Sequence, residues 1–382
     1  MLNKVINNEA LGVIFPNSYD GLVPELVKER LMASIPFASR YRLVDFVISS
    51  MARAGIDNIS LIARENYLSL MDHLGSGREW DLARKNGGLN VIPPYAQKAI
   101  KVYNGRVEAL ESIKSFLVSQ KEKYVVMSDS NVVANINYGD IIAAHKASGA
   151  DVTVVYRKQE IPENFKKPLG TNHDLYYTLD VEGNRVTQLF VNSKREGEVN
   201  FSMNIYVIDR ELLIRLIDEA YVLGFTCFER DVLAPQIDML DIQGFCYDGY
   251  VAFIHDMKSY FDENMRLLEA DNLDALFGPG PVWTKIRDDN PTRYIKGAKV
   301  SNVMAADGCV IEGEVENSVL FRGVKVAKGA KVKNCVLMQD TVVGEGANLE
   351  YVITDKDVTI TSGKSLVGTD SFQVFVAKKQ TV

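Results

Sequence analysis

The C-terminal part of the chain is built from a short repeat. From about residue 291 onward, four similar tetrads recur at 301–304, 317–320, 334–337 and 350–353, and a glycine-led phrase keeps their phase at 297–300, 329–332 and 346–349. Short β repeats with glycine corners predict a β-helix with one repeat per coil. A β-sandwich with regular turns is the alternative. The tetrad valines are 16, 17 and 16 residues apart, and we expect them to stack as an apolar ladder inside the prism: Val303, Val319, Val336 and Val352.

The preceding residues, from 1 to about 275, show a different pattern. Strand-like runs at 11–15, 59–63, 124–127, 152–156 and 205–208 alternate with helical runs at 43–54, 138–148 and 210–223. This alternation predicts an α/β sheet. The glycines and prolines of residues 277–281 interrupt the pattern and are typical of a linker. In a chain of 382 residues we therefore expect a domain at 1–275, a linker at 276–290 and a β-helix domain at 291–382.

Composition narrows the functional classes. The chain is 47% hydrophobic and 24% charged, with a net charge of −7 and no basic tract, so we expect no nucleic-acid partner. It has no run of 18 apolar residues and no signal-peptide pattern, so we expect neither export nor a membrane span. The cysteines lack C-x-x-C spacing and are interpreted as buried free thiols in a reducing cytoplasm: Cys227, Cys246, Cys309 and Cys335.

One motif in the α/β part constrains its function. The segment YRLVDF at 41–46, followed by Ser49-Ser50 and Gly55-Ile56, resembles a stretch of sugar-nucleotide pyrophosphorylases that follows a glycine-rich phosphate loop. Here the loop's place holds LGVIFPNSYD at 11–20. Backbone N–H groups hold phosphates where glycine lets the chain come close, but Pro16 has no N–H and Phe15 adds a ring. The resemblance therefore implies a nucleotidyltransferase-like domain that lacks its glycine-rich phosphate loop.

Further motifs extend the resemblance over nearly the whole chain. They are DHLGSGREWDL at 72–82, NGG at 86–88, IPPY at 92–95, SMNIYV at 202–207, DGY at 248–250 and MAADGCVI at 304–311. Together they resemble bacterial glucose-1-phosphate adenylyltransferases, which make ADP-glucose and pyrophosphate from ATP and glucose 1-phosphate. The resemblance implies a Rossmann-like nucleotidyltransferase domain followed by a left-handed parallel β-helix.

The family positions that carry the chemistry are replaced. Phosphoryl-type transfer needs a phosphate cradle, a cation and a metal site. A thioether cannot neutralise phosphate charge, and an amide is a poorer Mg²⁺ ligand than a carboxylate. The family's sugar-phosphate motif falls loosely on residues 192–194. The family's phosphate loop falls on Phe15, its catalytic lysine on Met32, and its two metal-binding aspartates on Asn131 and Phe253. Arg106 and Val107 are expected to add bulk where the nucleotide would lie, and Glu108 is expected to add negative charge.

These losses together resemble the GlgD-type, non-catalytic subunits of bacterial glucose-1-phosphate adenylyltransferase. The resemblance implies a modulatory subunit of glycogen biosynthesis that pairs with the catalytic chain in a heterotetramer, self-associates when alone and needs no cofactor of its own, with Mg²⁺ in the catalytic partner. Two alternatives stay open: a nucleotidyltransferase rebuilt around Asp129, Lys28 and Asp256, and a stand-alone sugar-phosphate sensor. Packing of Phe15, Met32 and Phe253 in one closed pocket would exclude the enzyme.

Two weaker sites follow from the resemblance. In bacterial relatives, basic residues before the lost lysine and the arginine of the YRxIDF motif line an allosteric phosphate site, and these positions are Arg30 and Arg42 here. Neighbouring positions of that site read Glu29 and Pro36, so arginines held in surface ion pairs are the alternative. Ser202 and Met203 would be a remnant of the sugar pocket.

Other polar and aromatic residues have structural interpretations. The histidines share no metal-ligand spacing, so we expect structural or surface roles. Asp45 is expected to cap a helix and Arg42 to pair with backbone or an anion. Trp80 and Trp283 are expected to pack in the core. The histidines are His73, His145, His173 and His255, of which His255 is the best candidate for chemistry.

Overall fold

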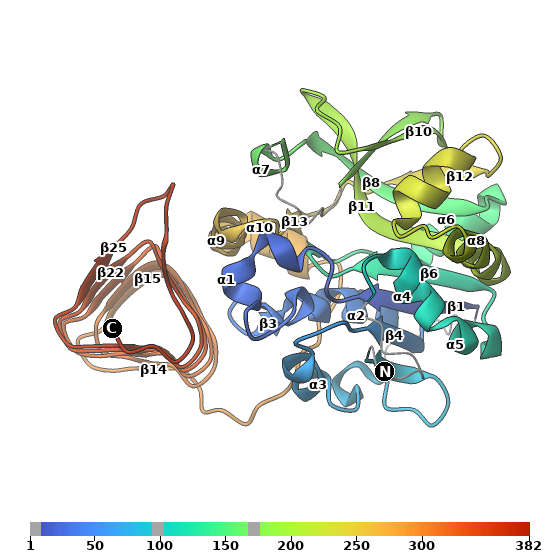
Figure 1. Ribbon diagram of the computed structural model, residues 1–382. Helices are drawn as coiled ribbons and strands as arrows, with labels where there is room; N and C mark the ends of the chain where they lie inside the picture. The colour runs from blue at the N-terminus through green and yellow to red at the C-terminus, as the bar shows by residue number, and fades with distance from the viewer. Residues whose placement is uncertain (1–8, 94–102, 167–175) are drawn as a thin grey trace.

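The computed structural model describes residues 9–93, 103–166 and 176–382, so the end of the IPPY motif and His173 lie outside it. An α/β domain lies beside a triangular coil of strands (Figure 1). Within the described residues, the α/β domain has a nine-stranded sheet of order β5-β4-β1-β6-β11-β8-β12-β10-β9, in which β5, β4, β1 and β6 are parallel. The strands are β1 (Ala10–Phe15), β4 (Asn58–Ile62), β5 (Gly88–Ile92), β6 (Tyr124–Asp129), β8 (Val152–Glu160), β9 (Tyr177–Glu182), β10 (Arg185–Val191), β11 (Glu198–Asp209) and β12 (Ile242–Cys246).

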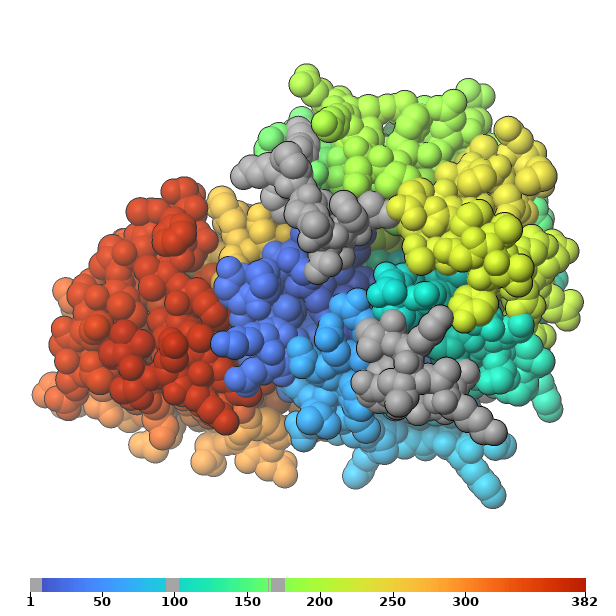
Figure 2. Space-filling view, in the orientation of Figure 1, coloured from blue at the N-terminus to red at the C-terminus, as the bar shows by residue number. Residues whose placement is uncertain are grey.

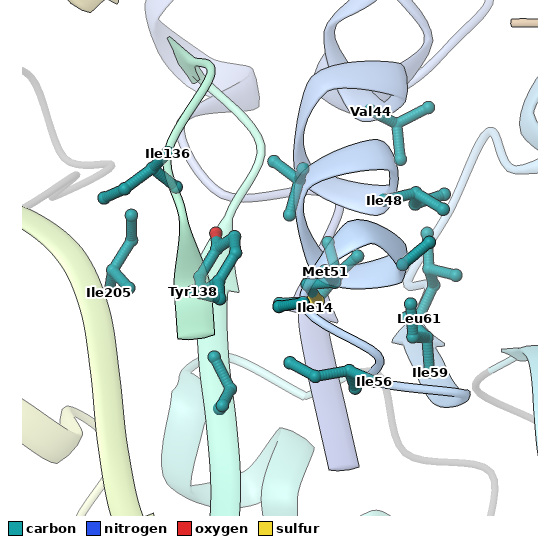
Figure 3. Close-up of a cluster of buried hydrophobic side chains, with 14 of the residues drawn as sticks. Ile14, Val44, Ile48, Met51, Ile56, Ile59, Leu61, Ile136, Tyr138 and Ile205 are labelled. Carbon is teal, nitrogen blue, oxygen red and sulfur yellow. The ribbon is translucent and has the colours of Figure 1, made fainter. Parts of the chain in front are cut away.

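Helices cover both faces of this sheet. On one face, α2 (Leu43–Arg53) buries apolar side chains against β1 and β4, and α6 (Tyr138–Ser148) lies against β8, β11 and β12. Figure 3 shows Ile48 and Met51 of α2 pointing toward Ile14 of β1 and Ile59 of β4. On the other face lie α4 (Arg106–Ser112), α5 (Lys114–Ser119) and α8 (Arg210–Val222). The predicted α/β pattern is confirmed, although β8 and β11 are longer than expected.

Shorter elements complete the part of the chain that precedes the second unit. They include α1 (Pro24–Val27), β2 (Pro36–Phe37), β3 (Tyr41–Arg42), α3 (Leu68–Leu74), β7 (Val132–Ala134), α7 (Glu163–Lys166), β13 (Val251–Phe253), α9 (Met257–Arg266) and α10 (Ala270–Phe277). Helix α10 continues through Phe277, so the expected domain limit at residue 275 falls inside a helix. Residues 281–292 then run without helix or strand to the second unit.

The second unit is a parallel β-helix. One sheet contains β14 (Arg293–Tyr294), β16 (Val310–Ile311), β18 (Lys325–Val326), β21 (Val342–Val343) and β24 (Thr359–Ile360). The other contains β15 (Lys299–Ala305), β17 (Glu314–Leu320), β19 (Lys331–Lys333), β20 (Val336–Leu337), β22 (Asn348–Glu350), β23 (Val352–Thr354), β25 (Ser365–Val367) and β26 (Val374–Val376). Every strand pairing between successive coils is parallel, as the repeat predicts.

The predicted valine ladder is wrong in register. Val319 pairs with Met304 and Val336, and Val336 pairs with Ile353, so Val303 and Val352 belong to the neighbouring register position. Because alternate side chains of a strand point to opposite faces, a slip of one residue changes the face that a side chain occupies. Val352 faces the prism interior, whereas Val319 and Val336 face outward and pack against the first domain.

That outward face docks the β-helix onto the α/β domain. Val319, Val336 and Ile353 share one apolar cluster with Leu26 and Phe261 of the first domain. Figure 2 shows the C-terminal coils in red lying directly against blue N-terminal residues. A buried ion pair crosses the same contact, with Arg30 Nη2 2.6 Å from Asp355 Oδ1. The predicted docking of the β-helix exterior on the first domain is confirmed.

Several structural expectations can be checked directly. Cys309 and Cys335 are buried, but Cys227 and Cys246 are only partly buried, so that expectation is half right; all four thiols are free. Trp80 is buried in the core as predicted. No helix of the described residues has both the length and the apolar character needed to cross a membrane.

Candidate functional site

The chain after β1 is held by side chains where the family has a phosphate loop. Asn17 accepts the N–H of Arg64 (2.7 Å) and donates to Asp20 (2.7 Å), while the Ser18 hydroxyl donates to Asp129 Oδ1 (2.7 Å). The Pro16 carbonyl accepts the N–H of Ala33 at 3.1 Å. These bonds fix the turn from within, so the turn does not present the row of converging N–H groups that a phosphate requires.

Arg106 crosses the space next to this turn. Gly105 makes its placement possible, because a Cβ there would lie 2.3 Å from the carbonyl oxygen of Thr226. The Arg106 guanidinium donates to both carboxylate oxygens of Asp129 (2.8 and 2.9 Å) and to Glu229, at the start of the π-helical turn Glu229–Leu233. It also lies 4.6 Å from the centre of the Phe15 ring, a cation–π contact.

One cation of this cluster is shared by two carboxylates. Burial disfavours a charged guanidinium, but the carboxylates of Asp129 and Glu229 outweigh it and hold the pKa of Arg106 above its ordinary value. Both carboxylates are almost fully buried. Nη2 of Arg106 donates to both oxygens of Asp129 and Nη1 donates to Glu229, and such hydrogen bonds between charged groups are stronger than neutral ones. Asp129, the best remaining metal ligand in this region, is therefore engaged by an internal cation.

A pocket of about 430 Å³ remains beside the cluster. Phe15, Arg106, Asp129 and Glu229 form part of its wall. Val107 does not, because it points into the core between helix and sheet, and Glu108 accepts the N–H of Asn104 at 2.6 Å. The expectation that Val107 and Glu108 obstruct the nucleotide position is therefore wrong; the obstruction comes from Phe15 and Arg106, and the negative charge from Asp129 and Glu229.

The other replaced family positions lie in packed surroundings. Met32 is buried in the cluster between the two domains, and its N–H donates to Asp20 Oδ1 at 2.7 Å. Phe253 packs edge-on against Phe201, with ring centres 5.3 Å apart. Asn131 is buried, and its Oδ1 has no hydrogen-bond partner among the described residues. Phe15 lies in a separate cluster from Met32, so the proposed meeting of Phe15, Met32 and Phe253 in one pocket does not occur.

Side chains of the protein also fill the region where the resemblance places a sugar pocket. Asn204 stands where the family has glycine, keeps a left-handed backbone (φ 53°) and donates to the Tyr19 hydroxyl at 2.6 Å. Ser202 and Met203 are buried in β11, and neither lines the pocket beside Arg106. Tyr19, Phe165, Tyr176 and Phe201 then form a chain of ring contacts. The residues 192–194 lie nearby, where the Asn192 side chain accepts the N–H of Tyr176.

The residues of the rebuilt-enzyme alternative are engaged elsewhere. Lys28 is exposed just after α1, and Asp256 caps α9 by accepting the N–H of Ser259 at 2.6 Å. Neither lines the pocket that contains Asp129. Among the described residues, no group of three or more His, Cys, Asp or Glu side chains could hold a metal ion.

Histidines in the described part of the chain have protein partners. His73 lies 2.6 Å from Asp45 Oδ1, His145 lies 2.8 Å from the Thr153 hydroxyl, and His255 lies 3.7 Å from Asp256. Asp45 also accepts the N–H of Arg42 at 2.9 Å and so caps α2, as predicted. These contacts support structural roles.

A second pocket, of about 410 Å³, lies between the two domains. From the first domain, Arg40, Arg42 and Ser69 line it, and from the connecting segment Lys285 and Arg287 do so. The β-helix contributes the residue just before one corner in successive coils: Arg322, Gln339, Lys356 and Lys378. The first three are 17 residues apart, which is the coil spacing, so they form a ladder along one edge of the prism.

The cations of this pocket are poorly balanced. Burial, with repulsion from Arg42 and Arg30, lowers the pKa of Lys356 to about 7. Burial and repulsion from Arg40 and Arg287 lower the pKa of Arg322, whose Nε has no partner among the described residues. Arg42 donates to the Ser69 carbonyl at 2.6 Å rather than to a carboxylate. Arg322 is buried and Arg42 and Lys356 are half-buried, and cations that repel one another in such surroundings favour an anion in the space between them.

The sequence identified part of this pocket. Arg42 and Pro36 line it, whereas Arg30 is paired with Asp355 of the β-helix. Arg322 and Lys356 were missed. Their signal was present, because each is a basic residue directly before a left-handed corner, at Gly323 (φ 74°) and Asp357 (φ 60°), two coils apart.

Comparisons with known families agree with this architecture. The nucleotidyl transferase model matches residues 25–165, and a model of GlmU-like, C-terminal hexapeptide regions matches residues 286–374. The chain is thus a nucleotidyltransferase-fold domain joined to a left-handed β-helix of hexapeptide type.

Relatives specify the family. The chain is 34% identical to the glycogen biosynthesis protein GlgD of Bacillus subtilis and 35% identical to that of Geobacillus stearothermophilus, in each case over 86% of this chain and 84% of the relative. It is 32% identical to a glucose-1-phosphate adenylyltransferase of Geobacillus stearothermophilus, over 78% of this chain and 76% of the relative. The chain belongs to the GlgD glycogen biosynthesis proteins, which are related to the glucose-1-phosphate adenylyltransferases.

Proposed function

We propose that this chain is a non-catalytic, modulatory subunit of a glucose-1-phosphate adenylyltransferase, and that it pairs in the cytoplasm with the catalytic chain of glycogen biosynthesis. The catalytic chain would bind Mg²⁺, ATP and glucose 1-phosphate. This chain would act by binding one state of its partner better than the other, because only differential binding shifts a conformational equilibrium.

The observation that carries the proposal is the Arg106 cluster. A nucleotidyltransferase needs free carboxylates for a metal ion and open backbone donors for phosphates. Asp129 is engaged by the Arg106 guanidinium at 2.8 Å, and the loop after β1 is closed by its own side chains. Releasing Arg106 would leave Asp129 and Glu229 buried and unpaired, which is strongly unfavourable. This supports a site that stays closed.

The interdomain pocket supports an effector role. We propose that Arg42, Lys356 and Arg322 bind a phosphate-bearing effector. Its anion would supply the negative charge that these cations lack in the protein alone. Arg30 lies next to this site but acts through its ion pair with Asp355, and so holds the two domains in register.

Partner pairing is tested by co-expression with a catalytic chain from the same family. We expect the two chains to co-purify as a mixed oligomer, consistent with a heterotetramer, and this chain alone to self-associate, because homologous chains offer similar surfaces for symmetric pairing. Light scattering reads out both. A full-length protein that stays monomeric at tens of micromolar, alone and with the catalytic chain, contradicts the proposal.

Catalysis is assigned by inactivating one chain at a time. The decisive sample contains this chain with a catalytic partner whose phosphate loop has been disabled. We expect no ADP-glucose from that sample, and altered activity or effector response when the partner is intact. Product formation with the disabled partner would instead support the rebuilt-enzyme alternative.

A further inference from the structure

Lys356 occupies an unusual position in the interdomain pocket. It follows β23 at the edge of the β-helix, and the nearest carboxylate, Asp355, is already bound to Arg30 at 2.6 Å. That carboxylate also accepts the backbone N–H of Lys356 at 2.7 Å. Among the described residues, no hydrogen bond or ion pair is formed by the Lys356 ammonium. The charge of Lys356 is therefore not balanced by the protein itself.

Apart from Asp355, the charged groups that act most strongly on Lys356 are basic. From the first domain, Arg30 and Arg42 face it, and within the β-helix Lys378 does so. His73 also lines the pocket; burial outweighs the opposing effect of its partner Asp45 and lowers the pKa of His73 below its ordinary value. The remaining charged groups at the pocket include Arg40, Arg287, Arg322, Lys285, Asp72 and Asp357, of which Asp72 is bound to Lys285 at 3.2 Å.

This environment has a chemical consequence. With a pKa of about 7, Lys356 is close to half protonated at neutral pH in the protein without ligand. A dianion placed among Lys356, Arg42 and Arg322 would favour the charged ammonium and raise its pKa again. Binding and protonation then assist each other, as linked equilibria require.

We propose that the interdomain pocket binds phosphate-type dianions together with one proton on Lys356, so that occupancy by an effector falls as the pH rises through neutrality. The proposal rests on the effector role proposed for this pocket. It adds a specific consequence, which is that this subunit would sense pH and anion concentration jointly.

Sulfate is the suitable probe because its own charge does not change between about pH 6 and pH 9, unlike that of phosphate. The full-length protein is titrated with sulfate by calorimetry at constant ionic strength. With a free pKa of about 7, the dissociation constant should rise about 30-fold between about pH 6 and about pH 8.5. At about pH 8, measurements in HEPES and in Tris, which both buffer there and differ in ionisation enthalpy, should give close to one proton taken up per sulfate.

Two lysine substitutions separate Lys356 from other titrating groups. Lys356→Arg keeps a permanent positive charge, so its sulfate affinity should vary less than about threefold over the same pH range. Lys325→Arg is the matched control on an exposed position of the same β-helix, and it should behave as the wild type. Thermal unfolding of each variant checks that the fold is kept.

Three results would overturn the inference. They are sulfate binding to the wild type without proton uptake, an unchanged pH dependence in Lys356→Arg, and no sulfate binding at any pH. None of them bears on the pairing with a catalytic chain, which is read from co-purification and light scattering. Failure of the proton linkage and failure of the subunit proposal are therefore distinguishable.

Discussion

The two pockets of this protein have similar volumes, about 430 and 410 Å³, but opposite electrostatics. In the pocket beside β1, the carboxylates of Asp129 and Glu229 share one internal cation, Arg106. In the interdomain pocket, Lys356 and Arg322 repel neighbouring cations and lack carboxylate partners of their own among the described residues. The cation of the first pocket is therefore held by the protein itself, whereas the cations of the interdomain pocket are the ones that we propose to bind an anion.

The first pocket also shows how a buried carboxylate can be engaged without a metal ion. The Arg106 guanidinium supplies a fixed cation beside Asp129, so this carboxylate is paired within the protein. Lys356 and Arg322 of the interdomain pocket have no such carboxylate partner among the described residues, and we propose that an anion takes that place.

The largest effect should be on catalysis in the first pocket. The purified chain should form ADP-glucose at the uncatalysed rate, at least about a millionfold below that of an enzyme. A pyrophosphate-release assay with ATP, Mg²⁺ and glucose 1-phosphate measures this, with a catalytic relative as the positive control. Turnover near ~1 s⁻¹ would break the comparison.

Nucleotide binding gives an independent measurement of the same pocket. Because Phe15 and Arg106 occupy the cavity wall, ATP–Mg²⁺ should bind weakly or not at all in titration calorimetry. A dissociation constant below about 1 μM, with one site per chain, would contradict this.

The next largest effect should be on the stability of the folded protein when Arg106, the cation shared by two buried carboxylates, is replaced. Arg106→Met leaves Asp129 and Glu229 buried without a cation, and should lower the free energy of unfolding by about 3–5 kcal/mol. Urea denaturation measures the change. Arg64→Met is the control, because Arg64 lines the same pocket but is about one-third exposed and pairs with the adjacent Glu65; it should change stability by less than about 1 kcal/mol. Equal effects of the two substitutions would show that Arg106 is not the structural counterion.

A substitution in the interdomain pocket should change the free energy of unfolding in the opposite direction. Lys356→Met removes an unbalanced cation and, in anion-free buffer near pH 6.5, should raise the free energy of unfolding by about 2 kcal/mol. The folded-state pKa of about 7 lies below that of an unfolded lysine. Between these two values the unfolded state binds more protons, so wild-type stability rises with pH and the gain from the substitution shrinks toward about pH 10.

Urea denaturation of wild type and variant at several pH values tests this difference. Lys325→Met, on an exposed position of the β-helix, should leave stability unchanged within about 0.5 kcal/mol. A Lys356→Met protein less stable than the wild type near neutral pH would mean that the pocket is balanced after all.

The smallest effect concerns stabilisation by anions. Sulfate at several times its dissociation constant should stabilise the wild type by about 1 kcal/mol beyond its general salting-out effect. Lys356→Met should keep only the general effect, while Arg64→Met should respond as the wild type. Thermal unfolding with matched sodium chloride controls measures this. A specific sulfate effect that survives in Lys356→Met would place the anion elsewhere.

Much of the fold could be predicted from the sequence because it depends on local patterns. The helices α2 and α8 follow from apolar periodicity, the strand β1 follows from a short continuous apolar run, and the corner glycines indicate the β-helix. The register of its coils was not accessible in the same way. Asn302, Asn317 and Asn334 turn the chain at left-handed positions, so the valine that follows each turn does not always fall on the same face.

The candidate sites also separate into features that the sequence predicts and features that only the folded structure shows. From the sequence by itself we predict that the phosphate loop, the lysine and the metal carboxylates of a nucleotidyltransferase are replaced, because that prediction depends on the identity of single residues. Only the tertiary structure decided what replaced them. Arg106 reaches Glu229 across 123 positions of sequence, and Lys356 comes beside Arg42 only because the β-helix docks on the first domain. Charge balance is a property of groups brought together in space, and it exists only once the chain is folded.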